Sequence, residues 1–218
     1  MKKTFYAMLI VVMSFVACKK TTDGDNTQTG VDLGLSVKWG SCNLGAYSPD
    51  GFGDYFAWGE TKAKAEYSWE TYKFSNGTGE TFTKYINDSS FGVVDNKTVL
   101  EPEDDAAHMR LGGKWRMPTK EEMEELIATR ENASYKWEWK SVNGHDGWFV
   151  TYLKNNNSIF LPASSWSYSD NPDAGYYWTS SLMAGGPDGA WLLFFGSKGL
   201  GVSVDGRFVG LSIRPVSE

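Results

Sequence analysis

The chain has 218 residues and a formal net charge of −6, a length that predicts one domain or at most two small ones. An acidic surface repels phosphate groups, so nucleic acid is not an expected partner. With only two histidines and two cysteines in the sequence, there is little basis for a zinc site. We predict neither a cofactor nor a metal.

The N-terminal residues have the pattern of an export signal. Two lysines precede an almost entirely apolar segment, residues 5–16, which is shorter than the ~20 residues that span a membrane. Residues 15–18 resemble a bacterial lipobox, after which a cysteine becomes the lipidated first residue. We therefore expect a signal peptide at 1–17, a lipid on Cys18, and an outer-membrane lipoprotein facing the periplasm or the cell exterior. An ordinary signal peptide cut near Ala17 and an uncleaved anchor are the alternatives.

A polar segment separates this signal from the rest of the chain. Residues 18–30 are expected to be the lipidated cysteine and a flexible tether, since 19–30 contain no apolar residue. Signal removal leaves 19 basic and 27 acidic residues, a net charge of −8. From Val31 onward no second linker occurs, which predicts one domain at 31–218. Lipidation of Cys18 would leave this domain without an internal disulfide, so its core would have to stabilise it.

Apolar periodicity predicts two short helices, many short antiparallel strands and long loops, which is an α+β fold. The longer helix is expected to start at Thr119, because Pro118 precedes it and Glu122 completes a capping-box pattern. Short apolar runs bounded by Gly, Asn, Asp or Pro are typical of strands. In chain order, the expected elements are a strand at 37–39, helices at 103–109 and 119–130, and strands at 148–150, 158–161 and 190–195.

Three groups of segments carry a family resemblance: residues 31–46 with 53–60, residues 112–126, and residues 176–181 with 210–216. In this order they resemble the Fibrobacter succinogenes major paralogous domain family, common among Bacteroidetes lipoproteins. That family is similar to the C-type-lectin-like fold in the version found in formylglycine-generating enzymes. The resemblance implies that a strand near Val37 pairs with a C-terminal strand near Ile213, which would bring the chain ends together.

The departures from these relatives limit what the resemblance implies. Formylglycine-generating enzymes need cysteines in the C-terminal part of the domain, and none follows Cys42. Related iron-dependent sulfoxide synthases need a histidine cluster, whereas His108 and His145 are far apart in the sequence. The Glu-Pro-Asn and Trp-Asn-Asp calcium motifs of animal lectins are missing as well. Neither oxidase chemistry nor calcium-dependent sugar binding therefore carries over.

Two acidic groups are candidate chemical sites. Asp54 and Glu60, beside aromatic residues, are the best-placed pair for a glycosidase, although acidic residues next to aromatics are usually turn or surface residues. The acidic run at 101–105 has oxygen ligands suited to calcium. A charge cluster at a helix N-terminus is the favoured explanation of that run.

The C-terminal part of the domain is the main candidate binding region. Strand alternation puts Trp191, Leu193 and Phe195 on one side, and Val202 and Val204 are expected to share this core side. Both faces of the strand could be buried, as in a central strand. The alternative is an exposed apolar patch that marks an interaction site. The patch would consist of Leu192, Phe194, Phe208 and Val209.

Some members of the family resemble the variable proteins of diversity-generating retroelements, in which this segment is randomised on a lectin-like frame. That resemblance implies a ligand-facing set in the C-terminal segment. The set is Leu192, Phe194, Gly196, Leu200, Ser203, Asp205, Gly206, Phe208 and Val209. The preceding loop adds Trp166 and Tyr168, whose rings suit sugar stacking or protein recognition. Trp178 is expected to be a core residue.

The leading hypothesis is a non-enzymatic, lipid-anchored binding module for a glycan or a protein, monomeric or weakly oligomeric. Its anchor is expected to lie opposite the surface formed by residues 176–210. An envelope hydrolase using Asp54 and Glu60 is the second hypothesis. A structural or pilus-associated subunit, which would bury the same patch against another copy, is the third.

Overall fold

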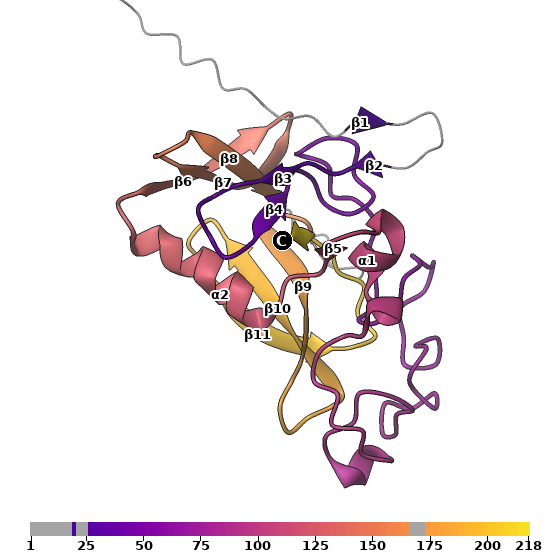
Figure 1. The fold of residues 1–218 in the computed structure, drawn as a ribbon. Helices are drawn as coiled ribbons and strands as arrows, with labels where there is room; N and C mark the ends of the chain where they lie inside the picture. Colours follow the sequence, from indigo (N-terminus) through magenta and orange to yellow (C-terminus); the bar gives the residue numbers. More distant parts are fainter. Residues whose placement is uncertain (1–18, 21–25, 166–172) are drawn as a thin grey trace, which may run out of the picture.

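A computed structural model describes residues 19–20, 26–165 and 173–218 of the chain (Figure 1). It has few helices and many antiparallel strands, which confirms the predicted α+β class. The helical elements are η1 (Ser89–Phe91), η2 (Pro102–Asp104), α1 (Ala106–Leu111), α2 (Lys120–Ala128) and η3 (Thr129–Glu131). The strands are β1 (Lys19–Lys20), β2 (Asn26–Thr27), β3 (Gly30–Val31), β4 (Lys38–Gly40), β5 (Trp115–Arg116), β6 (Tyr135–Val142), β7 (His145–Tyr152), β8 (Asn157–Pro162), β9 (Ala174–Leu182), β10 (Gly189–Gly196), β11 (Gly199–Gly206) and β12 (Val216–Ser217).

The strands form several small sheets. One has the order β11-β10-β9 and a second the order β6-β7-β8. A third joins the chain ends in the order β3-β4-β12-β5, and β1 pairs with β2. Tight hairpins follow from local sequence: the turn between β6 and β7 is Asn143-Gly144, with φ values of 51° and 87°. Asn-Gly is the pair that most readily adopts two successive left-handed residues.

Both predicted helices are present, with shifted ends. Thr119 and Glu122 form the capping box at the start of α2. The other helix was expected at 103–109, but α1 begins at Ala106. The Asp105 carboxylate accepts hydrogen bonds from the first free N–H groups of α1 and thereby fixes its start.

The expected tether differs from the structure at its C-terminal end. Residues 26–27 and Gly30 lie in strands. The Gln28 side chain bonds the backbone of Cys42 in both directions, donating to the carbonyl at 2.7 Å and accepting from the N–H at 3.2 Å. The folded domain therefore begins before Val31. The composition of this segment does not indicate it, because Gln28 joins the domain through side-chain hydrogen bonds and not through apolar packing.

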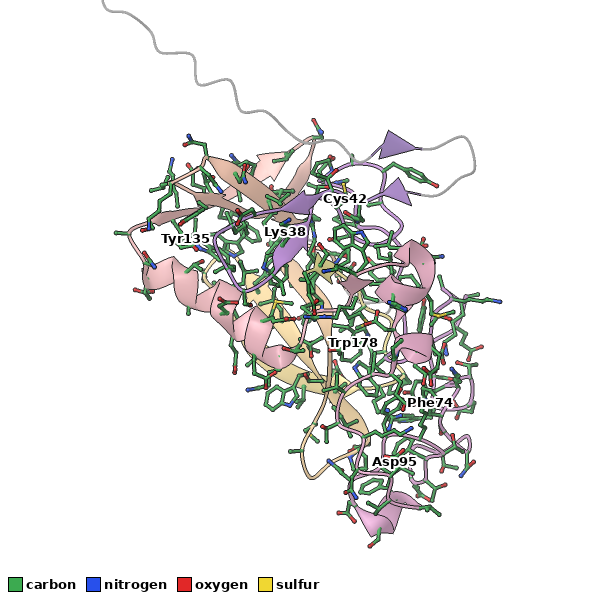
Figure 2. All side chains as sticks on the ribbon, viewed as in Figure 1. Lys38, Cys42, Phe74, Asp95, Tyr135 and Trp178 are labelled. Atoms are coloured by element: carbon green, nitrogen blue, oxygen red, sulfur yellow. The ribbon has the colours of Figure 1, made fainter. Side chains whose placement is uncertain are left out.

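The β9-β10-β11 sheet separates two hydrophobic clusters (Figure 2). On one face Trp178 and Leu192 pack against the long loops of residues 44–100. On the other, Leu193 and Phe195 pack with α2 and the β6-β7-β8 sheet. Trp178 is fully buried, as predicted. Other parts of the fold cover both faces of the sheet, which explains why its strands carry apolar side chains on both sides along most of their length. Among the described residues, no helix has the length and apolar character needed to cross a membrane.

The chain ends meet around a buried arginine. Trp39 of β4 pairs with Val216 of β12, as the family resemblance implies. Beside this pair, the fully buried Arg214 guanidinium donates to Gly40 O at 3.0 Å, Asn43 Oδ1 at 2.9 Å and Phe160 O at 2.6 Å. Burial lowers the pKa of Arg214 to about 10, so the group stays protonated at neutral pH. One side chain thereby links three segments that are distant in sequence.

Replacing Arg214 should therefore destabilise the whole domain. In Arg214→Met, three buried oxygens lose their donors, and we expect the free energy of unfolding to fall by about 3 kcal/mol or more. Urea denaturation monitored by tryptophan fluorescence measures the change. Arg110→Met is the matched control, because Arg110 forms a half-exposed ion pair with Asp54 and should change stability by less than about 1 kcal/mol. Equal losses in the two variants would contradict the central role of Arg214.

Candidate functional site

The expected apolar patch is split by the fold. Leu192 and Val209 are each only 1% exposed, whereas Phe194 is 43% exposed. The prediction that these residues share one surface is therefore wrong. The reason is that the loops of residues 44–100 cover the face of the sheet that carries Leu192 and pack against Val209. The alternative of two fully buried faces fails as well, at the Phe194 end of β10.

The remaining predicted residues lie along β11 and just after it. Ser203, Asp205 and Gly206 are partly exposed, and burial raises the pKa of the Asp205 carboxyl. Phe208 is partly buried, with its ring 4.6 Å from that of Trp69. Val204, expected on the core side with Val202, is 38% exposed.

A shallow hollow of about 490 Å³ lies at the turn between β10 and β11. Three predicted residues, Phe194, Gly196 and Leu200, line it. Its other lining residues are Asp173, Ser197, Lys198 and Gly199. The Tyr176 ring lies 6.4 Å from that of Phe194. Trp166 and Tyr168, also predicted here, lie outside the described residues.

Neighbouring elements hold this hollow in place. Trp148 of β7 donates its indole N–H to Gly196 O at 3.2 Å, and the rings of Trp139 and Phe195 pack edge to face. The turn therefore lies beside the β6-β7-β8 sheet, whereas the loop between β9 and β10 lies at the end remote from β3 and β4 (Figure 1). The expectation that the anchor lies opposite the 176–210 surface concerns Cys18, which lies outside the described residues, and it stays a prediction.

The chemistry of the hollow suits recognition. An exposed aromatic ring offers a face for an apolar or sugar surface. Lys198, Asp173 and Ser197 add a cation, a carboxylate and a hydroxyl at its margin. Small, largely apolar hollows with a few polar groups are typical of ligand sites.

The candidate catalytic carboxylates are each engaged elsewhere. Asp54 accepts a hydrogen bond from Arg110, and Glu60 bonds Lys64 at 2.9 Å and the Lys73 N–H at 2.8 Å. Neither lines the hollow at the β10-β11 turn. Each carboxylate is thus held by its own cation, and glycoside hydrolysis by this pair stays an alternative prediction.

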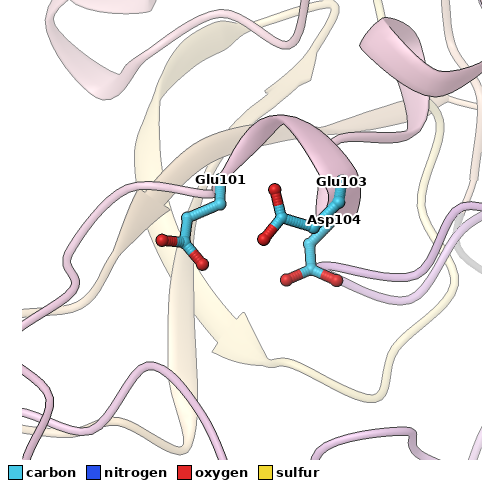
Figure 3. A group of neighbouring side chains, drawn as sticks. All are labelled: Glu101, Glu103 and Asp104. Carbon is cyan, nitrogen blue, oxygen red and sulfur yellow. The ribbon is translucent and has the colours of Figure 1, made fainter.

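The acidic run at 101–105 forms a cluster of Glu101, Glu103 and Asp104 (Figure 3). The Lys84 ammonium already lies among these groups, 2.5 Å from both Glu101 and Asp104 and 3.3 Å from Glu103. Lys73 bonds the other oxygen of Asp104. These lysines neutralise the charges that a calcium ion would need, so the arrangement favours the structural interpretation over the calcium one.

Proton affinities in this cluster follow from the same contacts. Burial on its own would lower the pKa of Lys84, but hydrogen bonds to Asp104 and Glu101 outweigh it and raise that pKa. Hydrogen bonds from Lys84 and Lys97 lower the pKa of Glu101 to about 2. For Asp104, burial opposes ionisation, yet hydrogen bonds from Lys73 and Lys84 lower its pKa.

Sequence reasoning missed the buried Arg207. Its guanidinium lies 4.8–5.9 Å from the centroids of five aromatic rings. These belong to Trp58, Tyr72, Phe74, Phe82 and Tyr85. It donates to Pro187 O at 2.6 Å and Tyr72 Oη at 2.9 Å. Its neighbours in sequence, Gly206 and Phe208, were predicted to face a ligand, and the only signal for Arg207 was a basic residue within an otherwise apolar stretch.

A second hollow, of about 300 Å³, lies beside α1 and includes Asp105, His108 and Arg116. Burial raises the pKa of Asp105, although its carboxylate accepts three backbone N–H groups, from Ala107, His108 and Met117. Arg116 is bonded to Glu122 through both terminal nitrogens. Asp105 thus holds α1 to the residue that follows β5, and Arg116 joins β5 to α2.

The expectation of a domain without an internal disulfide stays a prediction. Cys42 is fully buried. The other cysteine of the sequence, Cys18, lies outside the described residues. Cys42 falls in a segment whose side chains are nearly all buried, where its sulfur is shielded from solvent.

The sequence matches no known protein-family model, and neither curated proteins nor solved structures show significant similarity to the chain.

The lysine-carboxylate cluster predicts a pH-dependent contribution to stability. Because the pKa values of Asp104 and Glu101 are lowered in the folded state, their contribution is present above about pH 5 and is lost as the pH falls toward 2. Asp104→Asn should lose about 2 kcal/mol of unfolding free energy at pH 7 and much less at pH 2. Urea denaturation at the two pH values measures this. Glu103→Gln, whose side chain is 63% exposed, is the control, and a pH-independent loss in Asp104→Asn would refute the assignment.

Proposed function

We propose that this protein is a lipid-anchored, non-enzymatic binding module with a C-type-lectin-like domain. Three observations support the proposal: the lipobox-like sequence at 15–18, the pairing of β4 with β12 near the chain ends, and the hollow at the β10-β11 turn. Its ligand is a glycan or a protein. The resemblance to retroelement variable proteins adds the proposal that the segment around β10 and β11 is diversified.

One observation carries the proposal: Phe194 is a large aromatic side chain, 43% exposed, on an otherwise buried strand. The other large apolar residues of β10 lie in the two hydrophobic clusters or contact α2. Exposing Phe194 forgoes the ~1.5–3 kcal/mol that burying such a side chain contributes. A ligand that covers its ring would recover part of this free energy.

A glycan and protein array probed with the full chain in detergent tests the site. We expect binding that Phe194→Ala reduces at least tenfold, which corresponds to about 1.4 kcal/mol. Leu153→Ala is the matched control, because Leu153 is similarly exposed, at 47%, in the turn between β7 and β8. If Phe194→Ala binds as tightly as the unchanged protein, the hollow is not the binding site.

The lipid anchor needs a test of its own. We expect the protein extracted from membranes to carry a mass increment of a diacylglyceryl group with an N-acyl chain on Cys18. Two or three buried acyl chains, at ~0.8 kcal/mol per methylene, should partition it into the detergent phase. Cys18→Ser should abolish both properties. A peptide map in which Cys18 is disulfide-linked to Cys42 would contradict the anchor, because one sulfur cannot hold both groups.

A further inference from the structure

The outer edge of β11 is open to a further strand. Within the described part of the chain, β11 pairs with β10 alone, and every one of its residues is at least partly exposed. Figure 1 shows β11 along the outside of the sheet, with α2 packed against one face. An open edge presents unpaired N–H and C=O groups that can bind another strand.

The direction of these groups follows from the turn. A two-residue turn joins Gly196 to Gly199, which pair directly. Hydrogen-bonded pairs alternate along an antiparallel ladder, so Leu200, Val202 and Val204 direct their backbone groups away from β10. In the described regions no backbone group hydrogen-bonds to them.

The edge of the other sheet provides a contrast. β6 is an edge strand too, but it carries Lys136, Glu138 and Lys140, and the first two form an ion pair. Charged side chains on an edge strand prevent unwanted pairing. β11 has a single charged residue, Asp205, near one end, and has neither a proline nor a lysine.

We propose that β11 pairs antiparallel with β11 of a second copy of this chain, joining their three-stranded sheets. A two-fold axis at Val202 would place Val202 opposite the partner's Val202 and Leu200 opposite the partner's Val204. The outward-directed residues are symmetric about Val202, so all of them find hydrogen-bonding counterparts in this register. Such self-complementarity is what a two-fold interface requires.

The charges of this segment agree with that register. Its charged residues are Lys198 in the turn and Asp205 near the other end of β11. Antiparallel pairing brings Gly199 opposite the partner's Asp205, so each Lys198 meets an acidic group of the other copy. A parallel arrangement would instead bring like charges together. The partner's Val204 and Asp205 also border the hollow that contains Leu200, although pairing itself needs no ligand.

Analytical ultracentrifugation of the full chain in excess detergent tests the proposal, with a concentration-dependent dimer as the expected result. Val204→Pro removes an outward N–H without removing a bond to β10, and should weaken dimerisation at least tenfold. Val204→Thr, which keeps the N–H, should dimerise like the unchanged protein. Circular dichroism establishes that each variant is folded.

Cysteine cross-linking tests the register and does not depend on the proline variant. Hydrogen-bonded pairs have Cα atoms about 5.5 Å apart, within the range of a disulfide. Val202→Cys should therefore form covalent dimers on mild oxidation, whereas Val204→Cys should form them only together with Leu200→Cys. Equal cross-linking by both single variants overturns the register.

A chain that stays monomeric at its highest soluble concentration overturns the proposal and leaves the edge to an extended segment of another protein. Neither result depends on ligand binding at Phe194.

Discussion

The fold depends on burying a guanidinium group without a carboxylate partner. Arg214 satisfies its donors with two carbonyl oxygens and the Asn43 side chain, and no ion pair to it occurs in the described residues. A buried charge with unmet hydrogen bonds is strongly destabilising, so the folded core requires all three acceptors. The N-terminal strands, the C-terminal strand and β8 are thereby fixed relative to one another by one side chain.

Arg207 is a second buried cation, stabilised by aromatic rings as well as by carbonyl acceptors, and it orders the other half of the molecule. Its aromatic rings and carbonyl acceptors come from segments with little regular secondary structure, so these loops gain order from a shared cation. Once they cover one face of the central sheet, and α2 with the second sheet covers the other, two parts of that sheet stay accessible. They are the β10-β11 turn with Phe194 and the outer edge of β11, which is where binding and self-association are proposed.

Features set by local chemistry could be predicted from the sequence. The capping box at Thr119 and the short strands bounded by turn residues depend on neighbours in the chain. The burial of Leu192 and Val209 could not be predicted from the sequence, because it depends on distant loops that converge on Arg207. Strand alternation correctly separated Phe194 from Phe195, but it could not show where along β10 the covering loops end. The role of Gln28 was missed for a related reason: a polar side chain bonded to backbone leaves no periodic signal.

The pairing of β4 with β12 also determines how the domain would bear mechanical load. A pulling force on the N-terminal segment passes the β1-β2 pair and reaches β3 and β4, where it meets the ladder to β12 and the contacts of Arg214. The β9-β10-β11 sheet, which carries the hollow, is held by packing on both of its faces. Under the proposed anchoring and binding, tension between a membrane and a ligand would pass through this sheet and through the junction of β4 with β12.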